Sequence, residues 1–212
     1  MKFDKDQLQM VLALFLVAVI AAVLLGVTDM FTREPIAMAQ KAALHRALQQ
    51  VLPVYANDPQ SDEVDIGSGT EEAVHIYPGK DEKGKLTGIA WEVVAPDGYS
   101  GSIRILLGLH PDGSIEAIRV TDHRETPGLG DGIVKNIPWL ASFVGKTLAG
   151  TRWAVKKDGG DFDQFTGATI TPRAVVKAVR RGLEFYQARH QAILDAIGKA
   201  DGRKLGMQGG KQ

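Results

Sequence analysis

Three threonine hydroxyls fall within six residues of one another in the segment Asp163-Gln164-Phe165-Thr166-Gly167-Ala168-Thr169-Ile170-Thr171-Pro172. Gly167 and Ala168 leave the approach to the Thr169 hydroxyl open and let the backbone come close to a phosphate group. Pro172 suits the first position of a helix, and Thr171 suits its N-cap. A phosphate on Thr169 would face unpaired amides at the positive end of that helix, which favours the anion by about 0.3–1 kcal/mol. The segment therefore offers three chemically competent hydroxyls, Thr166, Thr169 and Thr171, in a setting that suits a phosphate; the alternative is a junction whose threonines only shape and cap the turn.

Two Gly-containing motifs precede this segment, Gly98-Tyr99-Ser100-Gly101 and Glu125-Thr126-Pro127-Gly128-Leu129-Gly130. Read as D-x-x-[ST]-G-A-T, the stretch from Asp163 to Thr169 resembles the signature at which a flavin transferase joins FMN through its phosphate to a threonine hydroxyl. The three motifs together, over residues 98–172, resemble the G subunit of the Rnf electron-transport complex and its relative, the C subunit of the sodium-pumping NADH:quinone oxidoreductase. The chain is short for the C subunit, so we favour the Rnf G subunit.

The resemblance implies one cofactor, FMN, attached covalently to Thr169. It also implies that residues of all three motifs surround the flavin: Tyr99, Ser100, Glu125, Thr126, Leu129, Gly130, Thr166, Gly167, Ala168, Ile170 and Thr171. Within that set, Thr126 is a hydrogen-bonding candidate and Leu129 an apolar contact for the isoalloxazine ring. The simpler alternative for their loop is a Pro-Gly turn between a strand and a helix, and Tyr99 either stacks on the ring or only occupies its own turn.

The function implied by the resemblance is that of a membrane-anchored flavoprotein subunit that relays electrons within an ion-translocating ferredoxin:NAD oxidoreductase complex. Its partners would be the other membrane and iron-sulfur subunits of an Rnf-type complex and, during maturation, a flavin transferase. Such a subunit is not a stand-alone enzyme, and we expect no catalytic residue in the Asp122-His123-Arg124-Glu125 cluster. A further alternative is a non-redox, membrane-anchored binding or scaffold module.

The composition excludes several classes of function. Lys plus Arg and Asp plus Glu each total 25, and this balance argues against a nucleic-acid partner, which needs a concentrated basic surface. The chain has no Cys, so it can form neither a disulfide, nor a thiolate-bound zinc site, nor a conventional iron-sulfur cluster. Its five His show no metal-ligand spacing, so no metal site is expected, and neither a GxGxxG motif nor a P-loop is present.

One segment is apolar enough to enter the lipid bilayer. Residues 10–27 carry no polar side chain, and a helix of that length with its flanks spans about 30 Å, the thickness of the hydrocarbon core. A cleaved signal peptide is the alternative, but the Ala37-Met38-Ala39 pattern lies well beyond the apolar run. Lys and Arg are balanced on the two sides, so charge does not orient the span. The resemblance implies a single-pass protein of the bacterial inner membrane with its C-terminal domain in the periplasm.

The remaining sequence predicts one α+β domain with an antiparallel sheet and a long C-terminal helix. We expect a cytoplasmic tip and anchor over residues 1–28, a juxtamembrane helix and linker over 29–69, the FMN-binding domain over 70–198 and a flexible tail over 199–212. The expected helices cover residues 37–51, 133–144 and 172–197, the last ending at Gly198. The expected strands cover residues 73–77, 86–95, 102–109, 114–122 and 147–156, with Pro78-Gly79 as a turn and residues 57–69 as a loop.

Overall fold

The structure is a computed structural model that describes residues 5–67 and 73–209 of the chain. The chain divides into two compact units, Met1–Leu44 and His45–Gln212.

Helix α1 (Lys5–Val51) forms the whole described part of the first unit and continues into the second. It has 47 residues, a length of about 70 Å, and its apolar stretch is exposed along its whole length, as in a helix that could cross a membrane. The predicted anchor and the predicted juxtamembrane helix are therefore one element. Pro35 lies inside α1 and does not end it, although its ring removes one backbone hydrogen bond.

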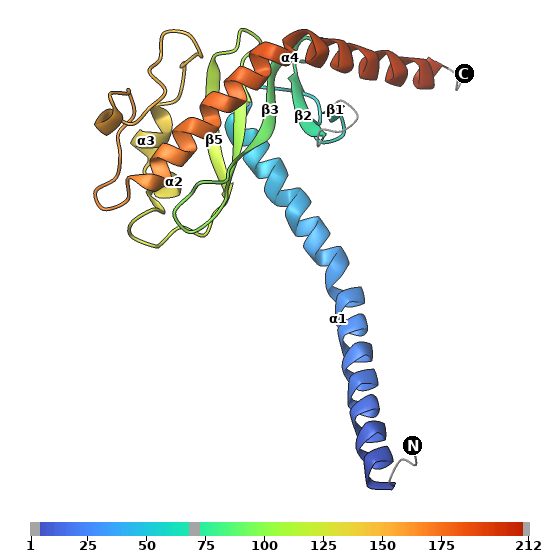
Figure 1. The fold of residues 1–212 in the computed structure, drawn as a ribbon. Helices are drawn as coiled ribbons and strands as arrows, with labels where there is room; N and C mark the ends of the chain where they lie inside the picture. Colours follow the sequence, from blue (N-terminus) through green and yellow to red (C-terminus); the bar gives the residue numbers. More distant parts are fainter. Residues whose placement is uncertain (1–4, 68–72, 210–212) are drawn as a thin grey trace. The chain divides into compact units, whose positions relative to one another are not determined.

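The second unit is built on a five-stranded antiparallel sheet in the order β1-β2-β3-β4-β5 (Figure 1). The strands are β1 (Val64–Ile66), β2 (Val74–Lys80), β3 (Leu86–Ala95), β4 (Ile103–Leu109) and β5 (Ile115–Asp122). Two short helices follow, α2 (Gly132–Lys135) and α3 (Ile137–Ala141), then a 3-10 turn, η1 (Lys156–Asp158), and the long helix α4 (Ile170–Gly209). The α+β class, the antiparallel meander and the long C-terminal helix are confirmed.

Helix α4 covers one face of the sheet and packs on β1, β3 and β4 (Figure 1). Ile105 and Leu107 of β4 belong to the fully buried core beneath it, where the Trp91 and Tyr186 rings stack at 6.1 Å. Gly182 permits the close approach, because a methyl group there would lie 2.7 Å from Leu107 Cδ2. The apolar face of α4 and the alternate residues of the strands therefore form the core that fixes the start of α4.

The last turn of α1 lies against the opposite face of the sheet. Leu48 and Val51 are fully buried there, and a methyl group on Gly108 of β4 would lie 1.8 Å from the Val51 carbonyl oxygen. Leu106, which points away from the α4 face because side chains alternate along a strand, is also buried. Strand β4 is therefore covered on both faces.

Two predictions about the sheet are wrong. The predicted loop over residues 57–69 contains β1, and the predicted Pro78-Gly79 turn lies inside β2. The Asn57 side chain holds β2 extended at this point, donating to the Pro78 carbonyl at 2.9 Å and accepting from the Lys80 amide at 2.7 Å. The real turn follows, where the Asp81 amide donates to the Lys85 carbonyl.

Two predictions about the segment between β5 and α4 also fail. The helix expected over residues 133–144 is split into α2 and α3 at Asn136, whose side chain caps α3 by accepting from the Trp139 amide. The strand expected over residues 147–156 is absent. Its backbone pairs locally instead, through a single bridge between Val155 and Phe162 and a bond from the Asp161 amide to the Arg152 carbonyl.

Helix α4 is longer at both ends than the predicted 172–197. It begins at Ile170 and passes through Gly198, so the tail expected to be flexible from residue 199 is helical as far as Gly209. Ion pairs explain this extension, because the Lys80 ammonium binds the Asp201 carboxylate and the Lys204 ammonium binds Asp62. Residues 210–212 of the predicted tail lie outside the described residues.

Candidate functional site

The three sequence motifs meet at the N-terminal end of α4, and a buried carboxylate joins them. Glu125 is only 4% exposed. Its Oε1 accepts a hydrogen bond from the Ser100 amide at 3.1 Å, and its Oε2 accepts one from the Thr171 hydroxyl at 2.6 Å. One side chain thus binds the 98–101 turn, its own loop and the first turn of α4 together.

The first turn of α4 differs from its prediction. The Thr169 carbonyl accepts from the Arg173 amide at 3.4 Å, so Thr169 is the N-cap and Pro172 is the third helical residue. Thr171, which was predicted as the N-cap, lies inside the helix, and its hydroxyl donates to Glu125 instead of capping the helix. Among the described residues the Thr169 hydroxyl has no hydrogen-bond partner, and its side chain is half-buried. The amides of Ile170 and Thr171 lead the helix, and Pro172 has no amide hydrogen.

A tight turn presents Thr169. The Ala168 amide donates to the Phe165 carbonyl at 3.1 Å, and Gly167 has φ of 78°, a value that favours glycine at the third position of a type II turn. A methyl group on Gly167 would lie 3.4 Å from Leu129 Cδ2, so the 125–130 loop lies directly beside this turn. Thr166, at the tip, is exposed.

The 125–130 loop is closed by Asp131, which the sequence analysis missed. Asp131 is buried, and its Oδ1 accepts from the Gly128 amide at 2.8 Å. The Lys135 ammonium, 2.5 Å from Oδ2, lowers the pKa of Asp131, so the carboxylate stays ionised. Asx turns of the usual kind bind the backbone two residues further on, whereas Asp131 binds an amide three residues before it.

Aromatic side chains anchor the turn over residues 165–168 to the rest of the domain. Phe165 packs edge-on against Trp139 at 5.2 Å, and Trp139 Nε1 donates to the Asp163 carbonyl at 2.8 Å. Gly132 makes room for the Phe165 ring, since a methyl group there would lie 2.9 Å from it. The segment before Thr169 is therefore anchored to α2 and α3, a contact between residues too far apart in sequence to be predicted.

Charged side chains surround the turn in pairs. The Arg173 guanidinium donates two hydrogen bonds to the Asp158 carboxylate, at 2.6 and 3.0 Å, and these bonds lower the pKa of Asp158. Asp163 is exposed and forms an ion pair with Lys156 at 2.7 Å. Both pairs are at the surface, and neither binds the Thr169 hydroxyl.

Several apolar side chains on the rim of the site are exposed to solvent. Tyr99 is 68% exposed, Leu129 48% and Ile170 46%. They come one from each motif. Thr126 and Ser100 are also exposed, although their backbones bind Leu129 and Glu125 respectively. The site is an open rim of loops that could hold a flat ring against apolar side chains.

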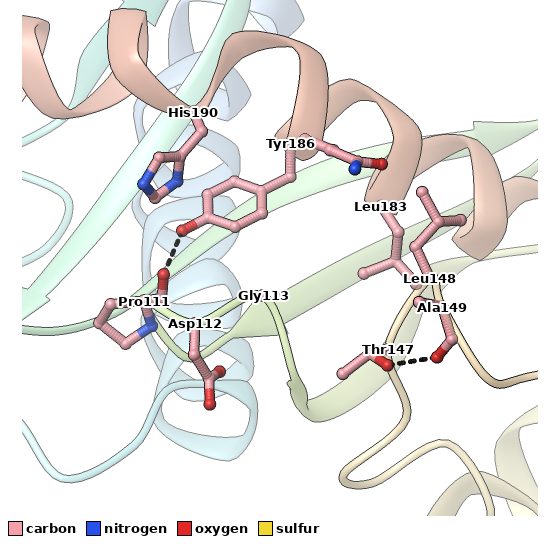
Figure 2. A pocket seen from close by; sticks show the side chains of 10 residues that line it. Pro111, Asp112, Gly113, Thr147, Leu148, Ala149, Leu183, Tyr186 and His190 are labelled. Carbon is pink, nitrogen blue, oxygen red and sulfur yellow. Dashed lines mark hydrogen bonds between the residues drawn. The ribbon is translucent and has the colours of Figure 1, made fainter.

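One cavity lies away from this site, beside Tyr186. Its volume is about 510 Å³, and it lies between the β4–β5 turn and the middle of α4. Figure 2 shows its lining, in which the Tyr186 hydroxyl points to the Pro111 carbonyl, to which it donates at 2.8 Å. Burial raises the pKa of Tyr186 to about 12. Tyr186 lies about 24 Å along α4 from its first residue, so this cavity takes no part in the site at Thr169.

The structure brings together one set of possible metal ligands that sequence spacing did not reveal. Ligand atoms of Glu63, Asp65 and His75 lie within 4.8 Å of one another on the exposed edge formed by β1 and β2. Here His75 Nδ1 is 2.6 Å from Glu63 Oε1 and 2.7 Å from Asp65 Oδ1, so the three side chains bind one another. Cross-strand pairing, which the sequence analysis missed with β1, creates this group.

Comparison with known proteins gives the family. Residues 1–51 match the model of the RnfG N-terminal region, and residues 98–184 match the model of the FMN-binding domain. The G subunit of an ion-translocating oxidoreductase complex from Aliivibrio fischeri is 44% identical over 195 residues, covering 87% of this chain and 91% of that protein. The chain belongs to the family of G subunits of ion-translocating oxidoreductase complexes. This membership sets aside the C subunit of the sodium-pumping enzyme as the family of the chain.

Other relatives in this family agree. The G subunit from Pseudomonas aeruginosa strain PAO1 is 40% identical, covering 90% of this chain and 93% of its own length. That from Shewanella oneidensis is 41% identical, with coverage of 86% and 89%. Among solved structures, the crystal structure of Shewanella oneidensis NqrC covers 68% of this chain and 74% of its own, with a TM-score of 0.47 and 21% identity. The match to the FMN-binding domain spans all three motifs that meet at Glu125.

Proposed function

We propose that this chain is the flavoprotein subunit of an Rnf-type ion-translocating oxidoreductase complex, and that it carries FMN as a phosphoester on Thr169. The observation that carries the proposal is the state of the three threonines. Thr171 is 1% exposed and its hydroxyl donates to Glu125, whereas the Thr169 hydroxyl has no partner among the described residues and lies at the N-cap of a long helix. Thr166 is exposed but lies at the tip of the turn, outside the helix start.

The residues present fit the cofactor. A phosphate on Thr169 would lie beside the leading amides of α4, and the positive end of the helix dipole stabilises an anion there. Tyr99, Leu129 and Ile170 supply exposed apolar surface for a flavin ring, and Thr126 supplies a hydroxyl. When bound, FMN would supply the electron-transfer chemistry, while the protein supplies position and electrostatics.

Attachment requires an activated flavin phosphate, such as a flavin dinucleotide, and a flavin transferase. The bond formed is Thr169 Oγ1 to phosphorus, and the bond broken joins that phosphorus to the departing nucleotide. The hydroxyl proton passes to the transferase or to water. This chain's part is to present the half-buried Thr169 hydroxyl, which has no partner among the described residues, on a turn at the helix start.

Replacement of Thr169 tests the proposal directly. The full-length chain is produced with a flavin transferase, extracted in detergent, denatured, and examined by intact mass, flavin fluorescence and peptide mapping. Wild type is expected to gain one FMN on the Thr169 peptide, and Thr169→Val to gain none. Thr121→Val, the same change on an exposed residue of β5, is the matched control and should retain flavin.

Two results would overturn this assignment. FMN found on Thr166 or Thr171 in wild type would move the attachment site. A colourless wild-type chain, made in cells shown to load another flavoprotein with the same transferase, would favour the non-redox anchored module.

The proposed topology places α1 across the bacterial inner membrane and the flavin domain in the periplasm. Because the chain has no Cys, single Cys variants report exposure without background. Lys83→Cys, in the exposed β2–β3 turn, should react with a membrane-impermeant maleimide in intact cells, whereas Asp6→Cys should react only after the membrane is opened. The reverse pattern would place the domain in the cytoplasm.

The proposed partners are the other membrane and iron-sulfur subunits of the complex, which would exchange electrons between ferredoxin and NAD and move sodium or protons. The chain has no Cys for an iron-sulfur cluster of its own, so its electrons must come from and pass to other subunits. Co-purification through a tag on this chain should recover those subunits. Recovery of the chain alone from gently solubilised membranes would count against the assembly.

A further inference from the structure

We propose that Glu125 is the positioning residue for flavin attachment: its carboxylate sets the first turn of α4 and keeps the Thr171 hydroxyl occupied, so that Thr169 alone presents a free hydroxyl at the helix start. The inference rests on the proposed attachment at Thr169. It gives Glu125 a role that does not require contact with the flavin.

The contacts of Glu125 are internal to the protein. Both carboxylate oxygens accept donors from other motifs, the Ser100 amide at 3.1 Å and the Thr171 hydroxyl at 2.6 Å. At 4% exposure the side chain is not free to turn towards solvent. A buried carboxylate held in this way is an organising centre, because loss of the acceptor leaves two donors unsatisfied.

Two glycines make the space that this carboxylate occupies. A methyl group on Gly130 would lie 2.6 Å from Glu125 Oε2 and 3.0 Å from the Thr171 hydroxyl oxygen. A methyl group on Gly98 would lie 2.3 Å from the Gly101 carbonyl oxygen and 2.9 Å from Glu125 Oε1, so the turn backbone and the carboxylate both approach closely there. Neither glycine has a positive φ, so close contacts rather than a special backbone conformation account for the absence of a side chain, and at Gly130 the closest of these contacts is the carboxylate itself.

The link to Thr169 runs through the helix start. The Thr169 carbonyl accepts the first hydrogen bond of the helix, from the Arg173 amide. Thr171, two residues after Thr169, is the residue whose hydroxyl donates to Glu125. Holding Thr171 therefore fixes the turn that carries Thr169. Without Glu125, the Thr171 hydroxyl loses its acceptor and the first turn can take other positions, which lowers the fraction of molecules that present Thr169 to the transferase.

Conservative variants separate hydrogen bonding from charge and from simple folding. In Glu125→Gln the amide oxygen can accept from the Ser100 amide, and the amide nitrogen can donate to the Thr171 hydroxyl, which can also accept. This variant should take up FMN at close to the wild-type rate. Glu125→Ala should slow uptake by about tenfold or more, since a hydrogen bond to a charged group is lost. From the other side of the contact, Thr171→Val should slow uptake and Thr171→Ser should preserve it.

The measurement is the rate of FMN incorporation, read by intact mass, when full-length chain purified without flavin is mixed with transferase and flavin dinucleotide. Intrinsic tryptophan fluorescence checks that each variant is folded. Glu92→Ala, which removes a carboxylate from β3 that pairs with Arg104, is the matched control and should not change the rate. If Glu125→Ala does not fold, the Thr171→Val and Thr171→Ser pair decides.

Three results would overturn the inference: wild-type uptake by folded Glu125→Ala, equal uptake by Thr171→Val and Thr171→Ser, or failure of folded Glu125→Gln as complete as that of Glu125→Ala. Failure of wild type to take FMN on Thr169 would instead overturn the proposed function. The two failures are thus distinguishable in one experiment.

Discussion

Replacement of Gly108 by Ala tests how the end of α1 is seated on the sheet. The new methyl group would lie 1.8 Å from the Val51 carbonyl oxygen and 3.0 Å from Val51 Cβ. Backbone must therefore move by more than about 1 Å, because close-packed interiors do not compress by such amounts. Strand β4 is hydrogen-bonded to β3 and β5 along its length, so we expect the end of α1 to move rather than the strand.

The cost follows from what that movement exposes. Leu48, Val51 and Leu52 are at most 6% exposed. Burial of each side chain contributes about 1.5–3 kcal/mol, so detachment of all three should lower the free energy of unfolding by about 5–9 kcal/mol, as an upper estimate. Local overpacking without detachment would cost only about 1–3 kcal/mol.

Tryptophan fluorescence can measure this difference in the full-length protein. All three Trp of the chain, Trp91, Trp139 and Trp153, lie in the second unit, so denaturant unfolding followed at this signal reports on that unit. Hydrogen exchange at Leu52, whose amide donates to the Leu48 carbonyl at 2.9 Å, should become faster if the helix end detaches.

Gly202→Ala is the matched control. Gly202 lies in α4 with nothing within 4 Å of a new methyl group, so the same substitution should stabilise by about 0.5–1 kcal/mol through helix propensity. A loss below about 1 kcal/mol for Gly108→Ala, within the range of ordinary surface changes, would refute the contact between Val51 and β4.

Three further predictions address other parts of the domain. Gly130→Ala should lower the free energy of unfolding by about 1.5–3 kcal/mol, because its methyl group displaces Glu125 from Thr171; an unchanged denaturation midpoint would contradict this. The hydrogen bond from His75 to Asp65 raises the pKa of His75, so the stabilisation that it contributes should be full below about pH 6.5 and should disappear as the pH rises through the raised pKa. The melting temperatures of wild type and His75→Gln should therefore differ at low pH and converge at high pH. A difference that stays constant with pH would count against the ion pair. Lys80→Met should lower the free energy of unfolding by about 3 kcal/mol, which is the low end for a broken buried ion pair because Asp201 is 40% exposed. Lys83 is exposed, so Lys83→Met should have no measurable effect in the same denaturation assay.

Local patterns in the sequence predicted most of the elements that carry the site. The β-branched and aromatic residues of 86–95 and 114–122, bounded by Pro-Asp-Gly turns, predicted β3 and β5 to within one residue. The three motifs were found in the sequence and do meet in space. Strand periodicity and turn chemistry act over a few residues, so the sequence reports them directly.

Predictions failed where a distant partner decides the local conformation. Gly198 is an ordinary stop signal for a helix, but α4 passes through it because Asp201 binds Lys80, 121 positions away in the sequence. Residues 147–156 have strand composition but pair with Asp161 and Phe162 instead. Neither outcome can be read from propensity, because a long-range contact contributes more than the local preference.

The sequence by itself determined the apolar span, the absence of thiol chemistry and the three threonines that could carry a phosphate, since these depend only on which side chains are present and how they are spaced. Only the tertiary structure decided that the Thr171 hydroxyl is bound while the Thr169 hydroxyl, at the helix start, has no partner among the described residues. That decision depends on Glu125, 46 positions before Thr171, because a buried carboxylate must take its donors from whichever segments the fold brings within hydrogen-bond distance.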